Sequence, residues 1–96
     1  MNINVELRLA VDTGKVSIGY RSTYKTIASN KGKLVIVPKK GNNNIIDDIK
    51  HLCKVSNIKL IEFDGNAIDL GNICGKPYSI NAIAIIDQGN AHILGD

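Results

Sequence analysis

Two cations and two hydroxyl side chains follow a glycine early in the chain, at Gly19, Arg21, Ser22, Thr23 and Lys25. The segment has the pattern of a short strand, a glycine turn and the first turn of a helix. Gly19 has no Cβ, so we expect another backbone to approach this turn closely. Ser22 or Thr23 is expected to cap the helix. Free N–H groups at a helix start, with cations beside them, suit a phosphate group. The alternative is an ordinary solvated helix start that carries two cations.

Two further segments carry basic or aromatic side chains. Lys39 and Lys40 belong to a basic loop over residues 38–43. Farther along, Pro77 restricts Lys76 to an extended conformation and would hold Tyr78 in a defined place. A tyrosine beside a lysine on a rigid loop can stack on an unpaired base. The alternative is that Tyr78 packs into the edge of the sheet as a core aromatic.

No group of residues typical of an enzyme is present. The sequence has neither a nucleophile with a recognisable base nor a phosphate-binding Gly-x-x-x-x-Gly-Lys-Ser/Thr loop. His51 and Cys53 lack the further ligands that a metal site needs. Cys53 and Cys74 lie among apolar residues, so we interpret them as core thiols in a reducing compartment. The sequence therefore predicts no catalytic residue, no cofactor and no metal.

Length and charge indicate one small domain, residues 1–96, with a polyanionic partner. The net charge is +3, but the first forty residues hold eight cations and two acids, and the remainder four cations and seven acids. A basic half favours nucleic acid, and the alternative is a solvated surface with a chance bias. No apolar run is long enough for a bilayer and no signal peptide is visible, so we expect a cytoplasmic protein with no membrane partner.

Hydrophobic periodicity predicts alternating helices and strands. Helices are expected over residues 3–11, from 20 to about 30, over 45–53 and over 70–74; strands are expected over 16–19, 34–37, 59–63 and 80–87. The first segment alternates like a strand as well, but its composition and the stop at Gly14 favour a helix. The unbroken apolar run of the second strand is typical of a central strand, and the fourth strand is apolar enough to be central as well. This order predicts an α/β protein with helices on both faces of a sheet.

Several local features are also predicted. Tyr20, Tyr24, Ile27 and Ala28 share one face of the second helix, and Gly75 is expected to stop the fourth. Pro38 should end the second strand, and residues 64–66 should form a turn that closes the third. Asn44 is expected to cap the third helix, which would place Asp47 and Asp48 near its positive end. Residues 91–94 are expected to pack back on the sheet.

In order and spacing, these motifs resemble the archaeal and eukaryotic L-thirty-e family of large-subunit ribosomal proteins, which belongs to a kink-turn RNA-binding superfamily. The resemblance covers residues 6 to 94, and its segments are Glu6-Leu7-Arg8, Asp12-Thr13-Gly14-Lys15, Gly19-Tyr20-Arg21-Ser22-Thr23 with Lys25, Lys33-Leu34-Val35-Ile36-Val37, Asp48-Ile49, Gly65 with Leu70-Gly71, Gly75-Lys76-Pro77, the strand into Asp87, and Ile93-Leu94. It implies a three-layer α/β/α sandwich around a mixed four-stranded sheet of order 1-4-2-3.

The resemblance also implies a function without catalysis. The chain would be a structural constituent of the large ribosomal subunit, with kink-turn-like ribosomal RNA and neighbouring ribosomal proteins as partners, and a monomer outside the ribosome. Its RNA-binding residues would be Gly19, Arg21, Ser22 and Lys25 at the second helix, Lys39 and Lys40 after the second strand, and Gly75, Lys76 and Tyr78, the last against an extruded base.

One position departs from the family. Lys40 stands where members usually carry an asparagine that contacts a purine edge, and lysine cannot accept a hydrogen bond. Lys39 and Lys40 would then contact phosphates instead. Two other functions stay open: a related kink-turn protein of another ribonucleoprotein, such as an RNA-guided modification particle, and an adaptor that binds protein through the sheet edge.

Overall fold

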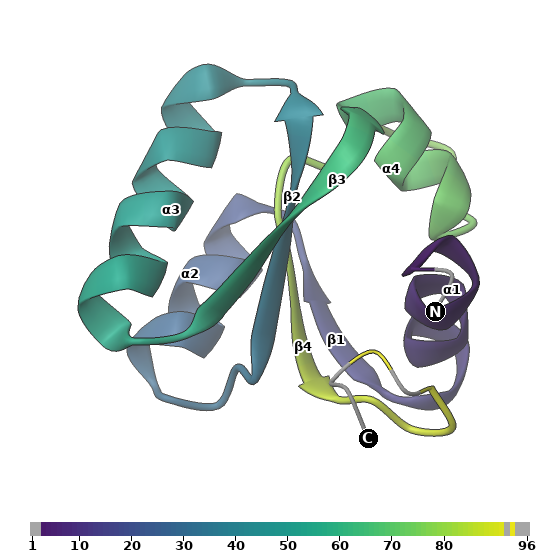
Figure 1. Cartoon of the computed structure of the whole chain (residues 1–96), viewed down its shortest axis with the longest axis horizontal. Helices are drawn as coiled ribbons and strands as arrows, with labels where there is room; N and C mark the ends of the chain where they lie inside the picture. Colours follow the sequence, from purple (N-terminus) through teal and green to yellow (C-terminus); the bar gives the residue numbers. More distant parts are fainter. Residues whose placement is uncertain (1–2, 92, 94–96) are drawn as a thin grey trace.

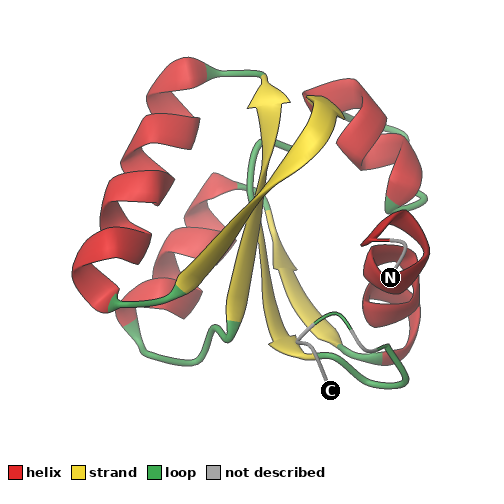
Figure 2. Cartoon of the chain, in the orientation of Figure 1, coloured by secondary structure: helices red, strands yellow, loops and turns green. Residues whose placement is uncertain are grey.

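Eight elements alternate along the chain in the computed structural model, which describes residues 3–91 and 93. They are α1 (Ile3–Thr13), β1 (Lys15–Ile18), α2 (Tyr20–Ala28), β2 (Leu34–Lys40), α3 (Asn43–Ser56), β3 (Lys59–Asn66), α4 (Ala67–Ile73) and β4 (Ile83–Asp87). Helices α2 and α3 cover one face of the sheet, and α1 and α4 cover the other (Figures 1 and 2). The predicted three-layer α/β/α sandwich is confirmed.

The four strands form one mixed sheet in the order β1-β4-β2-β3. β2 and β3 are parallel, whereas β4 runs antiparallel to both of its neighbours, β1 and β2. The predicted order and the central places of β2 and β4 are therefore confirmed. Because β1, β2 and β3 run the same way, all three end at one edge of the sheet, and β4 begins there.

The core divides into two parts along β2. Leu34 and Ile36 pack with residues of α1 and α4, whereas Val35 and Val37 pack with residues of α2 and α3. All four side chains are buried. Successive side chains of a strand point to opposite faces, so an unbroken apolar run supplies both layers at once.

Helix α1 settles an ambiguity that periodicity leaves open. Leu7 and Ala10 are fully buried, whereas Val5 is 59 % exposed. A strand would place Val5 and Leu7 on the same face, so the burial follows the helical period. The Gly14 N–H donates to the Ala10 carbonyl at 2.8 Å, as expected at a helix end.

The start of α2 differs from the prediction. Gly19 occupies the N-cap position with φ 94°, and no side chain caps the helix. Thr23 is fully buried inside the helix, and its Oγ1 donates to the Ser17 carbonyl at 3.4 Å. The predicted cap at Ser22 or Thr23 is therefore wrong. Another backbone does approach this turn, because the Ala82 carbonyl lies 2.9 Å from the Gly19 nitrogen. An added Cβ at Gly19 would meet nothing within 4 Å, so it is the positive φ and not this approach that requires glycine.

The buried face of α2 is also shifted from the predicted one. Its buried residues are Thr23, Thr26 and Ile27, whereas Tyr24 is 42 % exposed and Ala28 is exposed. The two threonines can be buried because their hydroxyls have partners: Thr26 Oγ1 lies 2.5 Å from Ser17 Oγ.

Strands β2 and β3 both extend past their predicted ends. β2 continues through Pro38 to Lys40, and β3 continues through residues 64–66, where a turn was predicted. β4 pairs with β2 only from Leu34 to Ile36, so Pro38 lies where β2 has a single neighbour. A proline, which has no N–H group, is tolerated at such a position. β4 itself begins at Ile83 and not at residue 80.

Helices α3 and α4 begin with asparagine caps. The Asn42 side chain accepts hydrogen bonds from the Asn44 and Ile45 N–H groups, so the predicted cap at Asn44 is wrong. As a result, Asp47 and Asp48 lie beyond the first turn of α3. Asn66 caps α4 in a reciprocal pair with Asp69. The predicted stop of α4 is confirmed, because Gly75 follows it with φ 74°.

Residues after β4 return to the core, as predicted for this segment. Ala91 and Ile93 are buried against it. His92 and Leu94, which belong to the same prediction, lie outside the described residues.

Both cysteines are buried and unpaired in the two core clusters, which confirms the interpretation of core thiols. Burial raises the pKa of Cys53 and of Cys74 from 9.0 to about 11. A raised pKa in the folded state means that the neutral thiol favours folding. This contribution is complete below pH 9 and is lost as the pH rises toward 11.

Replacement of either cysteine by alanine should therefore lower stability by roughly 1–2 kcal/mol, the cost of a small buried cavity. The affinity for RNA, the partner that the resemblance implies, should stay within about twofold, because neither thiol faces solvent. Urea unfolding at pH 7 and pH 10 measures the stability, and an RNA titration of the folded variants measures the affinity. The difference between the wild type and Cys53→Ala should be smaller at pH 10. Loss of a stoichiometric metal with either variant would contradict a purely structural role.

Candidate nucleic-acid interface

Three connections meet where β1, β2 and β3 end and β4 begins; we refer to this side of the sheet as the loop edge. The Gly19 N–H donates to the Ala82 carbonyl at 2.9 Å, and the Asn42 N–H donates to Asn81 Oδ1 at 2.8 Å. The segment before β4 is thus bonded both to the start of α2 and to the segment that follows β2. The fold therefore brings together the three connections on which the sequence-predicted residues lie.

The start of α2 presents its cations to solvent at the loop edge. Arg21, Ser22 and Lys25 are exposed. The Tyr20 hydroxyl donates to a carboxylate oxygen of Asp48, which joins the first turn of α2 to α3. This hydrogen bond, with smaller effects of burial and of the Asp48 charge, raises the pKa of Tyr20. The position of the first turn is therefore fixed by α3 and not by a capping side chain.

The end of β2 supplies two exposed lysines. The Lys39 Nζ lies 3.7 Å from Asp64 Oδ1, a solvent-exposed pair that contributes little to stability. Lys40 lies opposite Asn66 in the register of β2 and β3, and it forms no ion pair with any described residue. Of these two lysines, Lys39 is therefore paired with an acid in the free protein and Lys40 is not paired with any described acid.

The connection from α4 to β4 holds Tyr78 away from the core. Tyr78 is 54 % exposed, so it is not the core aromatic of the alternative interpretation. The Lys76 N–H donates to the Gly71 carbonyl at 2.9 Å. An added Cβ at Gly71 would lie 1.9 Å from the Tyr78 carbonyl oxygen, so the connection packs directly on α4. Arg8 closes the other side, where a Cβ at Gly75 would meet its guanidinium at 2.6 Å.

The cations of the first forty residues do not form one patch, although the sequence grouped them. Arg21, Lys25, Lys39 and Lys40 lie at or beside the loop edge. Lys15, Lys31 and Lys33 lie at the opposite edge, where β1 and β2 begin. Arg8 pairs with Asp12 through a 2.9 Å contact on α1. Charge counted along the chain therefore overstates the cations that one ligand could meet.

Sequence reasoning missed three asparagines at the loop edge. Asn42, Asn66 and Asn81 line a groove of about 400 Å³ together with Lys40. Asn66 ends β3, Asn42 follows β2 and Asn81 precedes β4, and this position at a strand end is the signal that could have identified them.

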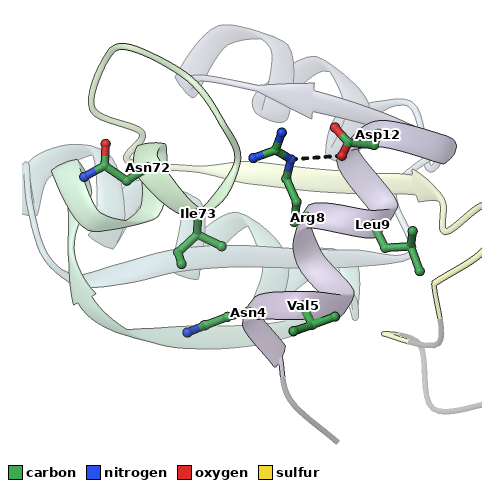
Figure 3. Close-up of a pocket in the computed structure, with 7 residues that line it drawn as sticks. All are labelled: Asn4, Val5, Arg8, Leu9, Asp12, Asn72 and Ile73. Atoms are coloured by element: carbon green, nitrogen blue, oxygen red, sulfur yellow. Dashed lines mark hydrogen bonds and ion pairs between the residues drawn. The ribbon is translucent and has the colours of Figure 1, made fainter.

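A second groove lies between α1 and α4, beside the start of the connection that leads to β4 (Figure 3). Val5, Leu9 and Ile73 give it an apolar surface, and the Arg8–Asp12 ion pair lies along α1 beside them. None of the residues that the sequence proposed for RNA lines it.

Other kinds of site receive no support from the described residues. Among residues 3–91 and 93, histidine, cysteine and acidic side chains form no group of three that could hold a metal ion. No described helix is both long and apolar enough to cross a bilayer.

Comparison of the sequence with known proteins identifies its family. The ribosomal protein L7Ae/L30e/S12e/Gadd45 family matches residues 1–95. The chain belongs to this family. Among family members named large ribosomal subunit protein eL30, that of Saccharolobus solfataricus is 43 % identical over 93 % of this chain and 82 % of its own. Those of Methanocaldococcus jannaschii and Methanobrevibacter smithii are 35 % and 32 % identical, over 98 % and 100 % of this chain and 86 % and 97 % of theirs. Membership of this family confirms the resemblance that was inferred from the sequence motifs.

Proposed function

We propose that the protein is a structural, non-catalytic constituent of the large ribosomal subunit that binds kink-turn-like ribosomal RNA at the loop edge. The observation that carries the proposal is the convergence of three connections that are far apart in the sequence. They bring Arg21, Lys25 and Lys40 to one edge of the sheet, and the connection that carries Lys76 and Tyr78 is bonded to the other two through Asn81 and Ala82. The relatives named as large-subunit proteins support the ribosome as the particle and the cytoplasm as its location.

The chemistry of each connection suits one part of a sharply bent RNA. The uncapped first turn of α2 offers backbone N–H groups beside Arg21, a combination that binds phosphate. Ser22 adds a hydroxyl donor. Lys25, Lys39 and Lys76 neutralise phosphates that a bend brings close together. The exposed ring of Tyr78 stacks on a base that the bend extrudes.

Lys40 has a different role in RNA binding from that of the asparagine that the family usually carries at this position. Its ammonium can donate but not accept, so it cannot match the mixed donor and acceptor edge of adenine. Without an acidic partner among the described residues, it contacts phosphate.

The proposal also covers the domain organisation and the oligomeric state of the protein outside the ribosome. Residues 1–96 act as one RNA-binding domain and a monomer, and neighbouring ribosomal proteins become partners once the RNA is bound. No cofactor takes part.

Binding of a kink-turn RNA, compared with a continuous duplex of the same length, tests the RNA part of the proposal. We expect the bent RNA to bind at least about tenfold more tightly, because the duplex offers no crowded phosphates or extruded base. Equal affinities would contradict it. Sucrose-gradient sedimentation of the native protein tests the particle. Migration with the large subunit is expected, whereas migration with a smaller RNA-containing particle or with protein alone would favour one of the two other functions.

A further inference from the structure

The groove at the loop edge is lined by side chains that donate hydrogen bonds. Its lining includes Asn42, Asn66 and Asn81, with Lys40 at one side and Ser79 at another, and it contains no carboxylate. Asn66 and Asn42 are exposed and Asn81 is half-buried, so a ligand can reach all three side chains.

The hydrogen bonds within the protein determine which atom each asparagine has left for a ligand. Asn81 Oδ1 accepts from the Asn42 N–H at 2.8 Å, and Asn66 Oδ1 accepts from the Asp69 N–H at 2.8 Å. Asn42 Oδ1 accepts from two N–H groups at the start of α3. Each carboxamide oxygen is therefore engaged in the fold, and each NH2 group is what the side chain can offer to a ligand.

A groove of donors selects a ligand edge of acceptors. Among the base edges in a nucleic acid, the guanine O6 and N7 edge places two acceptors side by side with no donor between them. Adenine presents an amino donor beside its N7 and is rejected by the same groups. Ile68, 63 % exposed, and Ala67 give the groove an apolar side against which the plane of a base can pack.

We propose that this groove reads a guanine of the bound RNA, with the NH2 groups of Asn66 and Asn81 donating to O6 and N7. The inference rests on the proposed function, because it names the base that the RNA presents at the loop edge. It assigns base recognition to residues other than Lys40, whose position in the chain is the one that the family uses. Phosphate oxygens share the acceptor chemistry of this guanine edge, so the test must separate the two.

Conservative variants can remove the donors and keep the fold. Asn81→Asp retains an oxygen for the Asn42 N–H but has no NH2 group. Asn66→Ser retains a capping oxygen for α4 without adding charge. Asn43→Asp is the matched control, because it adds the same charge next to Asn42 but does not line the groove. Melting temperatures near that of the wild type would show that the three variants are folded.

The measurement combines these variants with kink-turn RNAs in which single loop guanines carry 7-deazaguanine, which lacks the N7 acceptor. At one guanine, the modification should weaken wild-type binding roughly tenfold. Asn81→Asp and Asn66→Ser should each bind the unmodified RNA roughly tenfold more weakly, and at least one of them should be insensitive to the modification. Asn43→Asp should respond to the modification as the wild type does.

Two results would overturn the inference and leave the proposed function intact. In the first, the bent RNA binds tightly but every 7-deazaguanine costs the wild type and the variants equally. In the second, the loss in Asn81→Asp disappears when one loop phosphate is replaced by a neutral methylphosphonate, which would assign the donors to phosphate. If the wild type does not prefer the bent RNA to a duplex, the proposed function fails before the inference is tested.

Discussion

Raising the salt concentration from about 50 to 200 mM should weaken the binding of kink-turn RNA roughly 20- to 500-fold. Four cations lie at or beside the loop edge, namely Arg21, Lys25, Lys39 and Lys40, and Lys76 lies on the connection between α4 and β4. If about three to five phosphates are neutralised, log K falls with log salt at a slope of roughly −2 to −4.5, because each contact releases condensed counterions. Fluorescence anisotropy with a labelled RNA at four or more salt concentrations measures the slope.

Single neutralised lysines show whether the slope comes from the loop edge. Lys40→Gln should reduce the slope by about one, the effect of a single lost phosphate contact. Lys33→Gln removes the same charge at the opposite edge of the sheet, where β2 begins, and should leave the slope unchanged. Lys39→Gln should have a smaller effect than Lys40→Gln, because its ammonium lies 3.7 Å from Asp64 in the free protein. A flat titration, or equal effects of Lys33 and Lys40, would contradict binding at this edge.

The contrast between Lys33 and Lys40 shows what the sequence could not tell. Both belong to the basic first half, and only seven positions separate them. Lys40 ends β2 and Lys33 directly precedes its first residue, so one of them lies near the three connections and the other does not. A charge count along the chain has no information about strand direction, which comes from the pairing of β2 with β3 and β4.

The layers and the strand order were predictable for a different reason. The apolar runs of β2 and β4 are long and unbroken, and the family resemblance supplied the order in which the strands lie. For α1, where two periods fit, composition and the glycine after the helix were enough to choose correctly. Patterns that extend over a whole element average out local exceptions.

Predictions about helix starts failed because they depend on one or two backbone angles. Asn42 and Asn44 are equally good caps by residue type, and tertiary contacts decide between them, including the hydrogen bond from the Asn42 N–H to Asn81. At Gly19 the positive φ replaces a side-chain cap altogether. The groove asparagines were missed for the same reason, since their roles follow from which backbone groups engage their oxygens.

Truncation of Tyr78 should have the largest effect of any single side chain on RNA binding and almost none on folding. An aromatic ring that stacks on a base contributes roughly 1–3 kcal/mol to affinity. A buried aromatic would instead cost about 3–5 kcal/mol of folding stability when it is cut to alanine. Because Tyr78 is 54 % exposed, we expect Tyr78→Ala to melt near the wild-type temperature and to bind RNA about 5- to 150-fold more weakly.

Two further variants separate stacking from a general loss of surface. Tyr78→Phe keeps the ring and loses only a solvent-exposed hydroxyl, so it should bind almost as the wild type does. Val55→Ala is the control, since Val55 is another exposed side chain but lies near the end of α3, away from the loop edge. Its effect on affinity should be smaller than that of Tyr78→Ala. Equal losses from the two alanine variants would mean that Tyr78 has no special contact with the RNA. A Tyr78→Ala protein that unfolds readily but binds normally when folded would show that the ring supports the fold and not the base.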